Sequence, residues 1–104
     1  MYQAESATVT VSATLADCDA FPMGSFCGGI IEVPTGSSVT SLTFYHGMTE
    51  GGDFWPLYDE DGVSVSITVA AESAYTQPDA LNECVFVKAV ANATGSINWA
   101  GKAL

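Results

Sequence analysis

Regular alternation of apolar and polar residues is the feature that most limits what this chain can fold into. Two segments show it, at 7–15 and 63–69. Both place an apolar side chain at every second position, with serine or threonine between: Val9, Val11, Ala13 and Leu15, then Val63, Val65, Ile67 and Val69. Successive side chains of a β-strand point to opposite faces, so each run predicts a strand with one face on a core and the other in water.

Five further segments have the composition of short strands, at 26–33, 41–46, 54–58, 84–90 and 96–99. Turn-forming residues separate them, at 33–38, 50–53, 59–62 and 92–95. About seven to eight short strands at regular spacing predict an all-β fold: a single antiparallel β-sandwich over residues 1–104, either jelly-roll or immunoglobulin-like.

Single residues refine this prediction. Asp61-Gly62 favours a tight hairpin at 59–62, and Gly95 indicates another hairpin at 92–95. Gly28-Gly29 indicates a bulge or a close backbone approach, and Pro56 predicts an edge strand. The segments 16–25 and 70–83 are the least regular. The second could hold one helical turn before or after Pro78, but no amphipathic helix of useful length.

Charge limits the partners. The chain has twelve acidic residues and two basic ones, Lys88 and Lys102, and its net charge is −10. Nucleic-acid binding needs clustered Lys or Arg, and an anionic membrane would repel the chain, so we expect neither partner. A basic protein surface would attract it.

The N-terminal segment lacks the basic and continuous apolar regions of a secretion signal, so none is expected.

The three cysteines, Cys18, Cys27 and Cys84, are an odd number. Cys18 and Cys27 could close a nine-residue loop, but reduced, half-buried thiols are the favoured interpretation. Zinc is disfavoured because the spacing is wrong and His46 is the one other soft ligand. We therefore expect no metal and no cofactor.

No set of residues predicts a reaction. His46 has no nucleophile or orienting partner in a recognisable motif. The acidic residues are mostly in turns, where they explain turn geometry better than a glycosidase pair. Asp59-Glu60-Asp61-Gly62 invites a calcium interpretation, but Val63 returns at once to strand, which favours a hairpin turn. Asn92-Ala93-Thr94 matches a glycosylation sequon, which we attribute to chance. The prediction is a protein without enzymatic activity.

Aromatic residues allow three interpretations. They could form a stacking platform for a sugar, anchor a protein interface or fill the core, and the residues concerned are Tyr45, Phe54, Trp55, Tyr58 and Trp99. Core packing is favoured, because the residues alternate within strands and several must face inward.

The segment from Ser41 to Leu104 resembles small structural proteins of tailed bacteriophages. The similarity runs through LTFYHG, FWPLYDEDG, VSVSITVA, YTQPDAL and CVFVKAVANATGSINWAGK. The matching positions are Leu57, Tyr58, Asp59, Gly62, Val65, Val69, Tyr75, Pro78, Lys88, Asn92 and Gly95. The resemblance implies a β-sandwich capsid decoration protein or other virion component, located in the virion after assembly in the host cytoplasm.

Residues 1–40 lie outside this resemblance, and an extended arm or loop contacting a neighbour is one expectation for them. The leading hypothesis is a capsid cement or decoration protein that stabilises the phage head by binding the major capsid protein or another virion protein. Self-association is a further option, and a carbohydrate-binding or receptor-contacting module is the alternative function. The candidate contact residues are Phe21, Pro22, Met23, Phe26, Trp55 and Tyr58.

Overall fold

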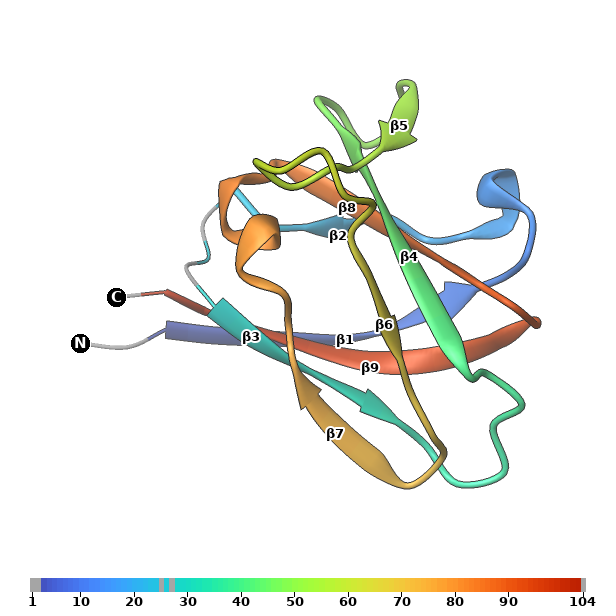
Figure 1. Cartoon of the computed structure of the whole chain (residues 1–104). Coiled ribbons are helices and arrows are strands. Elements are labelled where there is room, and N and C mark those ends of the chain that lie inside the picture. Colours follow the sequence, from blue (N-terminus) through green and yellow to red (C-terminus); the bar gives the residue numbers. More distant parts are fainter. Residues whose placement is uncertain (1–2, 25, 27, 104) are drawn as a thin grey trace.

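The computed structural model describes residues 3–24, 26 and 28–103 and has an all-β architecture, as the alternation predicts (Figure 1). The strands are β1 (Gln3–Val11), β2 (Phe21–Pro22), β3 (Gly28–Val33), β4 (Ser41–Gly47), β5 (Phe54–Pro56), β6 (Ser66–Thr68), β7 (Ser73–Thr76), β8 (Phe86–Ala91) and β9 (Gly95–Ala103). Two short 3-10 helices, η1 (Leu15–Asp17) and η2 (Asp79–Glu83), lie in connections.

The strands form two antiparallel sheets, with the orders β1-β9-β3-β7 and β2-β8-β4-β5, and β6 also pairs with β4. From β1 to β4 and from β6 to β9, every connection passes from one sheet to the other. In an immunoglobulin-like sandwich the first two strands share a sheet. Here β1 and β2 lie in different sheets. Two four-stranded sheets whose connections pass from one sheet to the other have the topology of a jelly roll, when β5 and β6 are counted as one strand position.

β5 and β6 divide one edge of β4 between them. β5 pairs with Tyr45–Gly47 and β6 with Ser41–Thr43. Phe44 joins the two halves, because its amide donates to the carbonyl of Val65 and its carbonyl accepts from the amide of Leu57, both at 3.0 Å. Together β5 and β6 therefore occupy one strand position, and the chain between them leaves the sheet.

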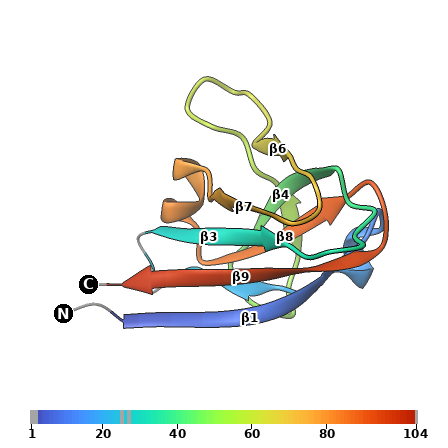
Figure 2. The ribbon, with the colours of Figure 1, turned by 90° about the horizontal axis from the view of Figure 1, so that it is seen from below.

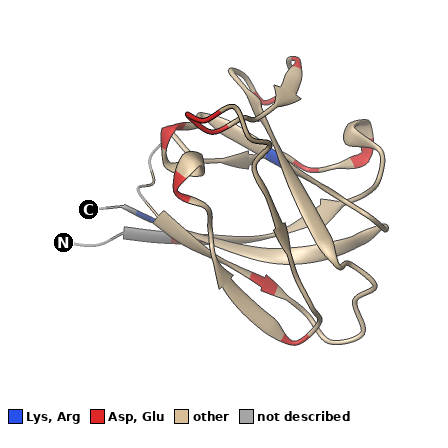
Figure 3. Ribbon diagram, in the orientation of Figure 1, with Lys and Arg blue, Asp and Glu red and all other residues tan. Residues whose placement is uncertain are grey.

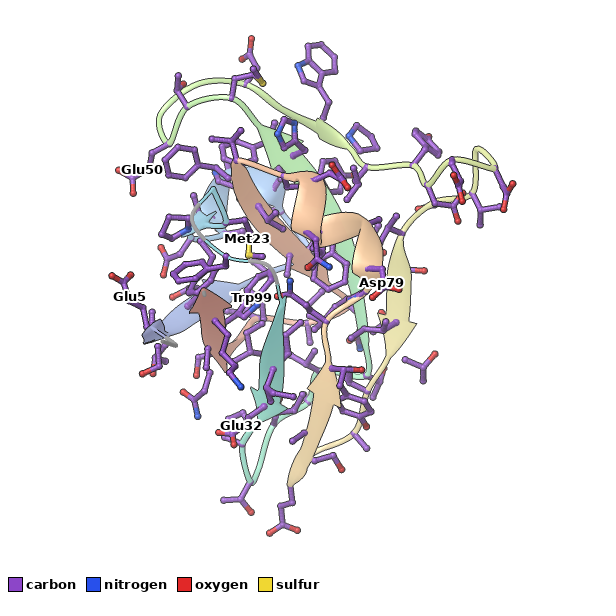
Figure 4. The ribbon with its side chains drawn as sticks, turned by 90° about the vertical axis from the view of Figure 1, so that its left-hand side faces the viewer. Glu5, Met23, Glu32, Glu50, Asp79 and Trp99 are labelled. Atoms are coloured by element: carbon purple, nitrogen blue, oxygen red, sulfur yellow. The ribbon has the colours of Figure 1, made fainter. Side chains whose placement is uncertain are left out.

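The core lies between the sheets around Trp99, which is 1% exposed (Figure 4). The Phe21 ring stacks on the indole with 4.8 Å between centroids, and the Phe44 ring meets it edge-on at 5.8 Å. The indole Nε1 donates to Oε1 of buried Gln77 at 3.1 Å, and Gln77 Nε2 donates to Asn82. The polar atoms that burial takes out of water are thus satisfied.

Gly28 and Gly29 pair with β9 in an uninterrupted register, so the bulge prediction is wrong for this segment. The close approach is confirmed at Gly29. A Cβ there would lie 2.5 Å from the backbone oxygen of Ala100 and 2.6 Å from Oε1 of Gln77. A Cβ on Gly28 would meet nothing within 4 Å.

Residues 3–11 and 28–33 are paired strands of the sandwich rather than an extended arm. β1 pairs with β9 over nine residues, and β3 lies between β9 and β7. β1 ends at Val11, earlier than the alternation indicated: Ser12 is buried, Ala13 is exposed and Leu15 begins η1. The irregular segment 70–83 contains an unexpected strand, β7.

The hairpin expected at Gly95 is absent, because β8 and β9 belong to different sheets. Residues 92–94 cross between the sheets instead. The Asn92 side chain secures this crossing by accepting from the amides of Thr40 and Ser41, at 2.7 and 3.2 Å. The side-chain amide of Asn92 therefore has a structural role: it holds the connection between β8 and β9 against the start of β4.

Candidate functional site

Exposed apolar side chains are concentrated in one segment of the chain, residues 48–65, which we call the projection. Six large hydrophobic side chains are exposed in the described part of the chain, and four lie here. They are Met48 (72% exposed), Trp55 (69%), Tyr58 (58%) and Val63 (58%). Figure 2 shows the yellow-green chain between β5 and β6 standing out from the sheets. A concentration of this kind is typical of interaction surfaces.

The base of the projection is anchored by Phe54. Its ring covers Gly47 of β4, where a Cβ would lie 2.8 Å from the ring atoms. The ammonium group of Lys88 lies 4.8 Å from the centroid of the same ring. Because side chains alternate along β5, burying Phe54 turns Trp55 to the opposite face. Pro56 lies on a sheet edge, as its missing amide hydrogen predicts.

The outer half of the projection is a tight hairpin, as Asp61-Gly62 predicts. Asp59 Oδ1 accepts from the amides of Asp61 and Val63, both at 2.9 Å. Gly62 has a φ of 76°, a conformation that glycine adopts at no steric cost. The hairpin interpretation of this acidic run is confirmed, and it accounts for Asp59 without a bound ion.

A groove of about 700 Å³ runs between this hairpin and η2. Its apolar lining comes from both sides: Leu57, Tyr58, Val63, Val65, Pro78 and Ala80. Its acidic lining does too: Asp59, Glu60, Asp79 and Glu83. In Figure 3 the red segments of the hairpin and of η2 lie at the same corner of the molecule. Both sides of the groove therefore carry apolar side chains and carboxylates, and we call the two sets of carboxylates its rims.

Other hollows lie elsewhere among the described residues. One of about 550 Å³ covers the outer face of β1, β9 and β3 around Thr8, Ile30 and Asn98. Two more, of about 410 and 480 Å³, lie on either side of Lys88. None of these four hollows is lined by His46, which is half-buried on β4. Within the described residues, no group of three or more His, Cys, Asp or Glu side chains could hold a metal ion.

The candidate contact residues divide into two sets. Phe21, Met23 and Phe26 are core residues, 2%, 0% and 8% exposed. Because their side chains are buried in the core, they are not part of the candidate contact surface. Pro22 is exposed on β2, where it pairs with Phe86 of β8. Trp55 and Tyr58 lie on the projection.

Sequence reasoning missed four residues of this surface. Alternation placed Val63 on the inner face, but the hairpin turns it outward. Met48 follows β4 and carried no motif. Asp79 and Glu83 reach the groove because η2 packs beside a hairpin about twenty residues earlier in the chain, and no local signal marks such a contact.

Cys18 and Cys84 are buried free thiols, and Cys27 lies outside the described residues, as does any loop closed by Cys18 and Cys27. Burial, with a smaller contribution from Glu83, raises the pKa of Cys84 to about 11. Burial also raises the pKa of Cys18, although the hydrogen bond to Ser12 opposes the shift. Both thiols are therefore poor nucleophiles, since the thiolate is the reactive form.

We expect a Cys27→Ser variant to show no reactive thiol toward a disulfide reagent at pH 8 while folded, and two when unfolded in guanidinium. Since the folded pKa of Cys84 exceeds the unfolded value of 9.0, its contribution to stability is present below about pH 9 and is lost as the pH rises toward 11. Chemical denaturation at pH 8 and pH 10.5 measures this loss. Rapid labelling of the folded protein at pH 8 would contradict the burial of both thiols.

Comparisons of the chain with protein-family models, curated proteins and solved structures found no match. In the part of the chain that the structure describes, no helix has the length and apolar character needed to cross a membrane.

Proposed function

We propose that this chain is a non-enzymatic structural protein of a tailed-phage virion, a cement or decoration protein that binds the major capsid protein or another virion protein. The observation that supports it best is the concentration of exposed Met48, Trp55, Tyr58 and Val63 on the projection. Trp and Tyr are the residues most enriched among the energetic anchors of protein interfaces.

Charge and fold agree with this proposal. A net charge of −10 favours association with a basic surface and accelerates the encounter. Jelly-roll sandwiches serve as viral capsid domains and as lectin domains, so the fold accommodates the proposal without specifying it. The phage assignment itself derives from the sequence resemblance over residues 41–104.

We expect Trp55→Ser to weaken binding to phage heads by roughly 30-fold or more, the effect of losing an interface anchor worth about 2 kcal/mol. The assay is cosedimentation with heads of the phage or prophage that encodes the chain, prepared without this protein. Val85→Ser is the matched control, since Val85 is exposed but lies outside the projection, and its affinity should change by less than about twofold. Binding of the unaltered protein should also raise the temperature at which the heads rupture.

No cosedimentation of the unaltered protein, or its absence from purified virions, would refute the proposal. Equal binding by the Trp55→Ser and Val85→Ser variants would refute the role of the projection.

The second candidate is a carbohydrate-binding module, favoured by the exposed indole of Trp55, which could stack on a sugar face. Because Trp99 is buried and Trp55 is 69% exposed, sugar binding would change mainly the Trp55 fluorescence. A glycan array without signal, together with unchanged fluorescence, would exclude this candidate.

A further inference from the structure

The groove between the hairpin and η2 has the chemistry of a peptide site. Tyr58 and Val63 leave more than half of their surface in water on one side, and Pro78 and Ala80 provide apolar surface on the other. The volume of about 700 Å³ lies within the range of small-ligand pockets. Apolar side chains of a partner would be removed from water here.

The carboxylates on the rims are not all equivalent. Asp59 Oδ1 is occupied by two amides of the turn. Glu60, Asp79 and Glu83 are exposed, and within the described part of the chain their side chains have no hydrogen bond or ion pair. These three charges are therefore free to pair with a ligand from both sides of the groove.

No lysine or arginine side chain lines the groove. Lys88 lies against Phe54 on the outer face of β8, and Lys102 lies near the end of β9 (Figure 3). The negative field of the rims is therefore not neutralised locally, and it favours cationic ligands over neutral ones. The carboxylates are not arranged as a metal-binding cluster, so a cation spread along a chain fits better than a single ion.

We propose that this groove binds a short basic segment of the partner protein, in which apolar side chains contact Tyr58 and Val63 while Lys or Arg side chains pair with Glu60, Asp79 and Glu83. In an extended segment that alternates basic and apolar residues, the apolar side chains share the face that contacts Tyr58 and Val63, and the long Lys or Arg side chains between them bend back to the rim carboxylates. The choice of a protein as the partner rests on the proposed function; the groove and its charges do not.

The test uses the whole chain and a fluorescein-labelled peptide of roughly eight residues in which lysine alternates with valine or leucine, which spans about 26 Å when extended. Fluorescence anisotropy should show saturable binding that weakens as salt rises from about 0.05 to 0.3 M, because salt screens exposed charges. A peptide with glutamate in place of lysine should not bind.

Removing the three rim charges (Glu60→Gln, Asp79→Asn and Glu83→Gln together) should weaken lysine-peptide binding by about tenfold or more. The matched control removes three charges elsewhere: Glu5→Gln, Glu32→Gln and Glu50→Gln. Figure 4 shows Glu5, Glu32 and Glu50 on the side of the molecule away from Asp79. Both triple variants change the net charge equally, and only the rim variant should lose affinity beyond about twofold. The single change Tyr58→Ser in the unaltered chain should also weaken peptide binding, but without altering its salt dependence.

Equal losses in the two triple variants would overturn the proposal, since attraction would then follow net charge rather than the groove. Absence of saturable binding to the unaltered chain would overturn it too. Repeating the head cosedimentation with the rim variant separates the two proposals. If heads retain that variant but not Trp55→Ser, the groove fails and the proposed function stands; if the peptide binds the groove but heads never bind, the proposed function fails alone.

Discussion

Replacing Trp99 with alanine is expected to lower the free energy of unfolding by about 3 to 5 kcal/mol, the usual cost of removing a large aromatic side chain from a core. The indole is 1% exposed and stacks on Phe21, so its loss leaves a void between the two sheets. It also leaves Oε1 of buried Gln77 without its indole donor. For a domain whose total stability is of the order of 5 to 15 kcal/mol, this is a large fraction.

Urea denaturation followed by far-ultraviolet circular dichroism measures this effect. The control is Trp55→Ala, which should change stability by less than about 0.5 kcal/mol because Trp55 is largely exposed. Trp99→Phe keeps much of the packing but not the hydrogen bond, and should cost about 1 to 3 kcal/mol, so the prediction remains testable if the alanine variant does not fold. Equal unfolding midpoints for the Trp99 and Trp55 alanine variants would contradict the role of Trp99.

The second large effect is expected at Gly29. In Gly29→Ala the new Cβ would lie 2.5 Å from the backbone oxygen of Ala100 in the adjacent strand. Backbone in the middle of a sheet cannot move away without disturbing its hydrogen bonds, so a loss of about 2 to 3 kcal/mol is expected, toward the upper end for overpacking.

Gly28→Ala is the matched control, one residue away in the same strand. A Cβ at Gly28 meets nothing within 4 Å, and alanine restricts the unfolded chain more than glycine does. We expect its stability to be unchanged or raised by up to about 1 kcal/mol. The same urea assay compares the two variants, and a loss at Gly28 as large as that at Gly29 would show that the clash is not the cause.

The local elements of the fold could be predicted where periodicity or turn chemistry is strong. The strand expected at 41–46 is β4, and the hairpin at 59–62 forms with Gly62 at positive φ. These features depend on neighbouring residues alone. The sandwich class followed from them and is confirmed.

Features that depend on distant residues could not be predicted in this way. Turn residues at 92–95 fit a hairpin, but whether the next strand joins the same sheet depends on the pairing of β9 with β1 and β3. β7 was missed because SAYT alternates weakly and gains its stability from β3. Phe21 and Met23 lie in a segment with irregular local sequence, so their burial was not evident.

The candidate site shows the same division. Trp55 and Tyr58 were identifiable as aromatic residues next to a strand-edge proline and a turn. The groove was not, because its second wall comes from η2, whose residues carry no motif of their own.

The place of β9 has a consequence for how the chain is made. β9 follows β1 and β3 at a long distance in the sequence and lies between them in the sheet. A ribosome releases the chain from its N-terminal end, so β1 and β3 emerge long before the strand that joins them. Their edges that face β9 lack this partner until β9 has been synthesised, and folding then closes contacts between segments that are far apart in the sequence, a topology that slows folding. Completion of this sheet therefore follows the synthesis of β9, and protection of β1 from aggregation is most needed before that point.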